Sequence, residues 1–192
     1  MRAPAALVLL VAGIVAWVGP SLAVQPLYLE GITRGPYRGR VVDAETQQPL
    51  AGAAVVAMWD RVRRLPLHSR NEFYAAREVL TDADGRFVLD ARDIEENAPE
   101  ETYLPHFVIY YPGYGFFPQH QVTPRGPTGG IFEGAGVTVE LPRLKTREER
   151  RDTVSLSRMG VDRVPRKQIA GLVRLVNLEA ARVGLKPYPE KD

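Results

Sequence analysis

Aspartates, histidines and tyrosines are the residues of this sequence whose spacing could support chemistry. Asp82 and Asp84 precede Gly85 in the stretch TDADGRF (Thr81–Phe87). A helix–loop–helix calcium site needs ligands at alternate positions, a glycine at the sixth and a glutamate at the twelfth. Here the glycine comes too early, and the twelfth position is Asp93. Asp-Gly between alternating apolar residues instead predicts a tight hairpin turn, with Asp82 hydrogen-bonded to the turn backbone.

The three histidines, His68, His106 and His120, are the candidate metal ligands. Zinc hydrolases usually place two histidines at short spacing beside a carboxylate, and no two of these histidines have that spacing. Four tyrosines crowd the same region: Tyr103, Tyr110, Tyr111 and Tyr114. We predict no metal site and no cofactor. A small metal-binding protein or metalloenzyme that uses His106, His120 and the tyrosines remains the alternative.

The usual nucleophiles are absent from the sequence. The chain of 192 residues has no cysteine, and it contains neither a G-x-S-x-G stretch nor a phosphate-binding G-x-x-x-x-G-K-[ST] loop. We therefore predict no catalytic residues and no enzymatic activity. The candidate ligand contacts are aromatic residues, because exposed rings can stack on sugar rings: Tyr114, Phe116, Phe117 and His120.

The charge balance bears on the class of partner. Lys and Arg number 25 and Asp and Glu number 23, a net of +2, which argues against a general nucleic-acid binder. Residues 143–174 are locally basic, with ten basic residues against four acidic ones. This segment is expected to be a solvated face, with contact to anionic lipid, a surface polymer or the acidic residues 90–102 as alternatives.

Short strands must position these residues. Alternating patterns predict strands over 37–43, 54–62, 77–81, 86–89, 103–111, 116–122 and 136–141. Residues 63–76 and 123–130 are predicted to be loops, and residues 90–102 a solvated acidic excursion. About seven short strands with Gly/Pro turns predict a mainly β fold, a seven-stranded antiparallel Greek-key β-sandwich over residues 37–142.

Residues 143–192 change to a helical pattern and form a predicted C-terminal helical appendage. Thr146 and Glu149 make a capping-box pattern, which opens a short helix. Pro165 suits the first turn of a second helix, and Gly184 suits its C-terminal end. One apolar stripe follows helical spacing: Ile169, Leu172, Val173, Val176, Ala180 and Val183. We expect this stripe to pack against the sandwich or against a second subunit.

The N-terminal residues 1–23 have the layout of a secretory signal peptide. Arg2 precedes an apolar run over residues 5–18, and Ser21, Leu22 and Ala23 resemble a cleavage site. The run is short for a spanning helix, which needs about 20 residues. We expect an exported, periplasmic or secreted bacterial protein. A membrane anchor formed by residues 5–23 is the alternative, and residues 24–36 are a lead-in.

Four segments in this order resemble the carboxypeptidase regulatory-like domain, one of the transthyretin-like (prealbumin-like) β-sandwiches. They are GRVVDAETQQPLAGAAVVA (39–57), TDADGRFVL (81–89), YYPGY (110–114) and VTVEL (137–141). The resemblance covers residues 37–141 and implies a non-catalytic module with no family-wide catalytic residues. Intradiol dioxygenases have a related sandwich and bind iron through two tyrosines and two histidines, but their close histidine pair is absent here.

The resemblance and the leader together predict a non-enzymatic cell-envelope module that binds or scaffolds. Its partner is expected to be a protein or a cell-surface polysaccharide, without nucleic acid. Recognition is expected at the loops 63–76 and 123–130 or at the aromatic cluster. The ligand, the oligomeric state and the role of the helical tail are left open.

Overall fold

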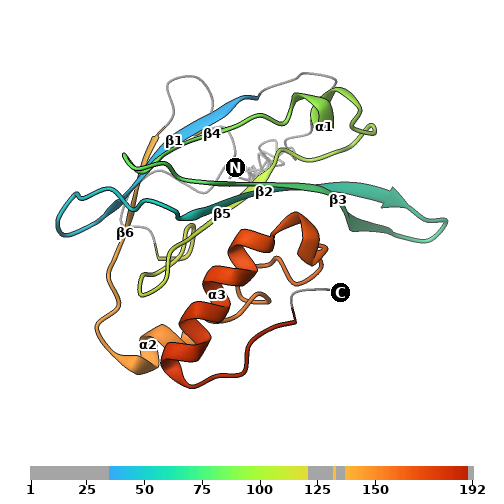
Figure 1. Cartoon of the computed structure of the whole chain (residues 1–192). Coiled ribbons are helices and arrows are strands. Elements are labelled where there is room, and N and C mark those ends of the chain that lie inside the picture. The colour runs from blue at the N-terminus through green and yellow to red at the C-terminus, as the bar shows by residue number, and fades with distance from the viewer. Residues whose placement is uncertain (1–34, 121–131, 133–136, 190–192) are drawn as a thin grey trace, which may run out of the picture.

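The computed structural model describes residues 35–120, 132 and 137–189. These residues form a mainly β protein, with two three-stranded sheets and a layer of helices (Figure 1). The strands are β1 (Tyr37–Asp43), β2 (Ala54–Arg64), β3 (Ser69–Leu80), β4 (Arg86–Leu89), β5 (His106–Tyr110) and β6 (Val137–Leu141). One sheet has the order β4-β1-β6 and the other β3-β2-β5.

The central strand of the sheet β3-β2-β5, β2, is buried on both faces over its first seven residues. Alternate residues of a strand point to opposite faces. Val55, Ala57 and Trp59 pack toward the sheet β4-β1-β6, whereas Val56 and Met58 pack toward the C-terminal helices. A strand buried on both sides can be apolar at every position, which explains why the first half of β2 has no polar residue.

The C-terminal residues form a third layer on this sheet (Figure 1). The layer contains α2 (Arg147–Asp152), the 3-10 turn η2 (Arg166–Gln168) and α3 (Ala170–Val183). The predicted capping box at Thr146 and Glu149 is present. Gly184 ends α3 in the left-handed conformation, with φ of 73°. Every residue of the predicted apolar stripe is buried, so its predicted packing against the sandwich is confirmed.

Several basic residues of this layer bind acceptors on other elements of the molecule. Arg143 pairs with Asp43, Arg150 with the buried Glu179, and Arg163 with Asp60. Arg147 donates to the carbonyl oxygen of Val183 at the end of α3. The expected solvated face is found in part, because the side chains of Arg143 and Arg163 are 58% and 42% exposed although each pairs with a buried carboxylate.

Two predicted segments have different structures. Residues 63–76 are not a loop, because β2 continues to Arg64 and pairs antiparallel with β3 from Ser69. Residues 116–120 contain no strand, only an isolated bridge between Ile109 and Phe117, and residues 121 and 122 lie outside the described ranges. Cross-strand hydrogen bonding along residues 61–73 compensates for the weak alternation that had suggested a loop.

Strand pairing also departs from an all-antiparallel sandwich. β1 pairs antiparallel with β4 and parallel with β6. The described residues contribute six strands. They establish a mainly β fold in two small sheets, which agrees with the predicted fold class at that level.

The turn at residues 82–85 is confirmed, although the predicted hairpin is wrong. Asp82 Oδ1 accepts hydrogen bonds from the backbone N–H groups of Asp84 and Arg86 at 3.0 and 2.8 Å. Gly85 has φ of +72°, and a Cβ there would lie 2.4 Å from the carbonyl oxygen of Val41. The turn joins β3 of one sheet to β4 of the other. It therefore links the two sheets.

The acidic segment 90–102 is only partly solvated. It contains the short helix α1 (Arg92–Glu96), in which Glu95 is buried. The carboxylate of Glu95 accepts hydrogen bonds from the Tyr37 hydroxyl and from Trp59 Nε1. The prediction of a solvated excursion is wrong for this residue, because two large core side chains donate to it.

The predicted leader 1–23, most of the lead-in 24–36 and the loop 123–130 lie outside the described residues. No helix in the ranges that the structure describes has the length and apolar character needed to cross a membrane.

Candidate functional site

The predicted aromatic contact residues lie in the interior. Tyr114, Phe116 and Phe117 are 7%, 2% and 0% exposed. Phe117 belongs to the core between the sheets, and Phe116 to the core under the helices. The expectation of exposed rings that stack on sugars is therefore wrong for these three residues. Phe116 and Phe117 lie in a segment that crosses from one core to the other.

Tyr114 is held in a polar network with Asp43 and Arg143. Its hydroxyl donates to Asp43 Oδ2 at 2.7 Å, and Arg143 donates to the same oxygen at 3.1 Å. Burial alone would raise the pKa of Asp43, but hydrogen bonds from Tyr114, the backbone N–H groups of Thr46 and Glu45, and Arg143 hold it well below 3.8. Burial, followed by the hydrogen bond to Asp43, raises the pKa of Tyr114. The network is structural, because its members satisfy one another.

The histidines are not arranged as a metal site. His120 packs edge-on against Phe116, with ring centroids 4.9 Å apart, and its Nδ1 accepts a hydrogen bond from the Phe116 backbone N–H at 3.2 Å. His68 and His106 are exposed. Within residues 35–120, 132 and 137–189, no three His, Asp or Glu side chains gather closely enough to hold a metal ion. The metal alternative draws no support from this placement.

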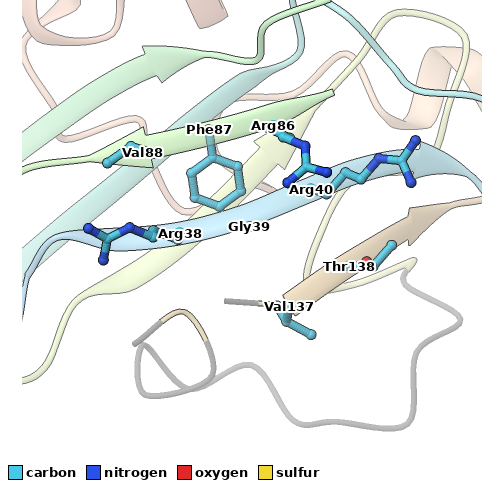
Figure 2. Close-up of a pocket in the computed structure, with 8 residues that line it drawn as sticks. All are labelled: Arg38, Gly39, Arg40, Arg86, Phe87, Val88, Val137 and Thr138. Carbon is cyan, nitrogen blue, oxygen red and sulfur yellow. The ribbon is translucent and has the colours of Figure 1, made fainter. Parts of the chain in front are cut away.

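A basic pocket lies on the sheet β4-β1-β6 and was not predicted from the sequence (Figure 2). Its volume is about 390 Å³. Residues from three adjacent strands line it: Arg38, Gly39, Arg40, Arg86, Phe87, Val88, Val137 and Thr138. Figure 2 shows Arg38 and Arg40 along β1 with their guanidinium groups pointing toward opposite ends of the strand, and Arg86 on β4 beside Arg40. On the face that the arginines share, the apolar lining residue is Val88, which is 57% exposed, whereas Phe87 belongs to the core.

The pairing of the strands brings the arginines together. Arg40 lies directly opposite Arg86, and Arg38 opposite Val88. Side chains at directly opposite positions have Cβ atoms about 5 Å apart, and like charges placed there are destabilising. Residues two apart on one strand are separated by about 6.8 Å. Arg40 and Arg86 therefore lie within the reach of one small ligand, and Arg38 lies farther along the same face.

The three guanidinium groups keep most of their hydrogen-bonding capacity. Arg40 Nε donates to the carbonyl oxygen of Asp84 at 3.0 Å, and Arg38 donates to the carbonyl oxygen of Pro36 at 3.3 Å. Among the described residues, no carboxylate forms an ion pair with Arg38, Arg40 or Arg86. Guanidinium groups without such partners are suited to bidentate recognition of carboxylate, sulfate or phosphate.

Sequence reasoning missed this site although half of its signal is visible. Alternation along β1 places Arg38 and Arg40 on one face, and alternation along β4 places Arg86 and Val88 on one face. The other half of the signal is the pairing of β1 with β4, whose paired residues lie between 46 positions apart (Arg40 and Arg86) and 52 positions apart (Tyr37 and Leu89) in the sequence. Nothing local in the sequence specifies that pairing.

Comparisons with known proteins place no family name on the chain. No family model matches it, and no curated protein matches it. Among solved structures, it is similar to 3-chlorocatechol 1,2-dioxygenase from Rhodococcus opacus 1CP, with 17% identity and a TM-score of 0.31. The match covers 56% of this chain and 59% of the dioxygenase chain. A likeness at this level carries no argument about function.

Proposed function

We propose that the protein is a non-enzymatic, exported envelope module that binds an acidic carbohydrate on the outer face of the sheet β4-β1-β6. The carrying observation is the like-charge pair Arg40 and Arg86, which lie opposite each other and form no ion pair within the described residues. A fold retains such a pair at a cost in stability. An anionic ligand would offset that cost.

The chemistry of the pocket supports an acidic carbohydrate over a neutral one. Three guanidinium groups supply forked donors for carboxylate or sulfate oxygens. Val88, which is 57% exposed and shares the face of Arg86, offers apolar contact for the C–H face of a sugar ring. We therefore assign ligand contact to this pocket and no longer to the buried rings of Tyr114, Phe116 and Phe117.

The far end of the β2–β3 pair, residues 63–70, provides a comparison for the pair Arg40 and Arg86. Arg63 and Arg70 also lie directly opposite each other. However, both of them contact the carboxylate of Glu72. There the like charges share a carboxylate, whereas the pair at Arg40 and Arg86 has no such neighbour in the described part of the chain.

Binding of a linear polyuronate, polygalacturonate, tests the proposal, with neutral dextran as the control polymer. The full chain should bind polygalacturonate and not dextran by calorimetry. Binding should weaken from about 0.1 to about 1 M salt, because the Debye length falls from roughly 10 to roughly 3 Å. Arg40→Ser should weaken binding roughly tenfold, since hydrogen bonds to charged groups contribute about 1.5–3 kcal/mol.

Arg92→Ser is the matched control, because it removes the same charge from an exposed position on α1. Equal weakening by Arg40→Ser and Arg92→Ser would show a general charge effect and would contradict a site in the pocket. Equal binding of dextran and polygalacturonate would contradict the acidic class of ligand.

The finer fold assignment and the cellular location belong to the same proposal. The segment order 39–57, 81–89, 110–114 and 137–141 supports a transthyretin-like Greek-key sandwich of the carboxypeptidase regulatory-like kind. The apolar run over residues 5–18 supports export. Both inferences rest on the sequence.

A further inference from the structure

The strands β2 and β3 extend beyond the rest of the sandwich as a two-stranded ribbon (Figure 1). On β2, Arg61 and Val62 still contact residues 101 and 102 of the neighbouring segment. From Arg63 to Arg70 the two strands pair with each other. A turn closed by the hydrogen bond from Leu65 N–H to the His68 carbonyl oxygen joins them. This segment, residues 63–70, is called the ribbon tip below.

The ribbon tip presents an apolar end. Leu67 is 96% exposed, which is the highest value among the large apolar side chains that the structure records as exposed. Pro66 beside it is also exposed. Leu67 lies in the turn closed by Leu65 and His68, after the last paired residues, Arg64 and Ser69. The leucine therefore stands at the very end of the ribbon, just beyond Arg64.

Arginines surround the base of this apolar end. Four of them lie on the two strands: Arg61, Arg63, Arg64 and Arg70. Two glutamates contact them, Glu72 and Glu101. Four arginines against two glutamates leave an excess of two positive charges on the ribbon.

We infer that the ribbon tip inserts Leu67 into the surface of a bilayer that carries anionic headgroups. An apolar side chain at the end of a basic element matches the interface, where apolar groups reach about 5–10 Å into the headgroup and acyl boundary. The arginines then lie at the level of the anionic headgroups, and each contributes attraction near that surface. This inference is independent of the basic pocket, which lies on the other sheet.

A single label at the tip tests the insertion. Because the chain has no cysteine, Leu67→Cys provides a unique site for a solvatochromic dye. The emission should shift to the blue on vesicles of phosphatidylcholine with phosphatidylglycerol, and not on vesicles of phosphatidylcholine alone. Leu178→Cys, at an exposed leucine of α3, is the control and should not shift. An absent shift at position 67, or equal shifts at both positions, would overturn the inference.

Two substitutions test the apolar and the basic parts separately, by vesicle co-sedimentation of the full chain. Leu67→Asp should lower the partition coefficient at least tenfold, because it removes the leucine side chain that the bilayer would bury. Arg63→Ser should reduce it roughly fivefold. Arg158→Ser is matched to Arg63→Ser in exposure, with 56% against 55%.

Arg158→Ser should leave vesicle binding unchanged. If Arg63→Ser and Arg158→Ser reduce binding equally, attraction depends on net charge and the ribbon tip is not the contact. If Leu67→Asp binds like the unchanged chain, the apolar end does not insert. Either result overturns the inference. A tip that docks on a protein and not on a bilayer would give both results, because none of these substitutions would then change vesicle binding through the tip.

Discussion

At the scale of single residues, Asp43 joins three parts of the chain. Its Oδ1 accepts from the backbone N–H groups of Glu45 and Thr46 in the turn after β1. Its Oδ2 accepts from the Tyr114 hydroxyl and from Arg143. The carboxylate is almost fully buried, and each oxygen has its partners. Removing the charge would leave buried donors without an acceptor, which is more costly than losing one exposed ion pair.

Asp43→Asn should lower the free energy of unfolding by about 1.5–3 kcal/mol at pH 7. Because the pKa of Asp43 is lowered in the fold, its contribution is present above the ordinary pKa of 3.8 and is lost as pH falls below that value. The difference between the two proteins should therefore narrow in acid. Urea titrations at pH 7 and at lower pH measure it.

Asp84→Asn is the control for Asp43→Asn. Asp84 is exposed, and a surface change of this kind should stay within about 0.5 kcal/mol. A difference for Asp43→Asn that stays constant from pH 7 into acid would contradict the role given to its charge.

At the scale of elements, α3 receives its N-terminal cap from a distant strand. Ile169 occupies the N-cap position and has no side chain that could accept a hydrogen bond. Glu78 of β3 instead accepts from the backbone N–H groups of Gly171 at 2.8 Å and Leu172 at 2.5 Å. A carboxylate at a helix N-terminus is also favoured by the helix dipole. Glu78 thereby attaches α3 to the central sheet.

Glu78→Ala should lower the free energy of unfolding by about 0.5–2 kcal/mol, the usual effect of losing an N-cap. Burial, which outweighs the two backbone hydrogen bonds, raises the pKa of Glu78 above 4.5. Its contribution is therefore fully present below pH 4.5 and is lost as pH rises through the raised pKa. The effect of Glu78→Ala should be larger near pH 4.5 than at pH 8, as urea titration can measure.

Glu148→Ala is the control for this prediction, because Glu148 is exposed on α2 and should change stability by less than about 0.5 kcal/mol. The contributions of Asp43 and Glu78 to the free energy of unfolding should therefore change with pH in opposite directions. If the destabilisation caused by Glu78→Ala grew with rising pH, the pKa of Glu78 would not be raised by burial, and the prediction would be contradicted.

At the scale of the whole molecule, the helices form a layer that shares a core with the central sheet. Val56 and Met58 of β2 and Val108 of β5 pack in one cluster with Leu172 and Val176 of α3. Trp59, on the opposite face of β2, packs in the cluster between the sheets. One strand therefore serves both cores, and unfolding of either core should involve the other.

Leu172→Ala should lower the free energy of unfolding by about 2–5 kcal/mol, because it leaves a cavity at a fully buried position. Leu178→Ala on the exposed side of the same helix should have little effect. Far-UV circular dichroism follows the helices, and the fluorescence of Trp59 follows the core between the sheets. The two transitions should coincide in the variant; an earlier loss of helix alone would show that the C-terminal layer is a separate unit.

The sequence predicted those features whose cause is local. Alternation located β1 and β4 at their observed bounds, the Asp82 turn was recognised from Asp-Gly, and the capping box and Gly184 marked helix ends. It failed at residues 63–76 and 116–120, where the local pattern is weak. Strand pairing compensates for that weakness in residues 63–76, whereas residues 116–120 cross between two cores.

Tertiary structure decided which side chains are exposed and which are neighbours. The sequence alone determined that strands come first, that a helical stripe follows, and that Arg38 and Arg40 share a face. It did not determine that Arg86 lies opposite Arg40, that Tyr114 is buried against Asp43, or that Glu78 caps α3. Periodicity depends on a residue's own strand or helix, whereas these contacts depend on pairing and packing between segments far apart in the chain, which no local pattern records.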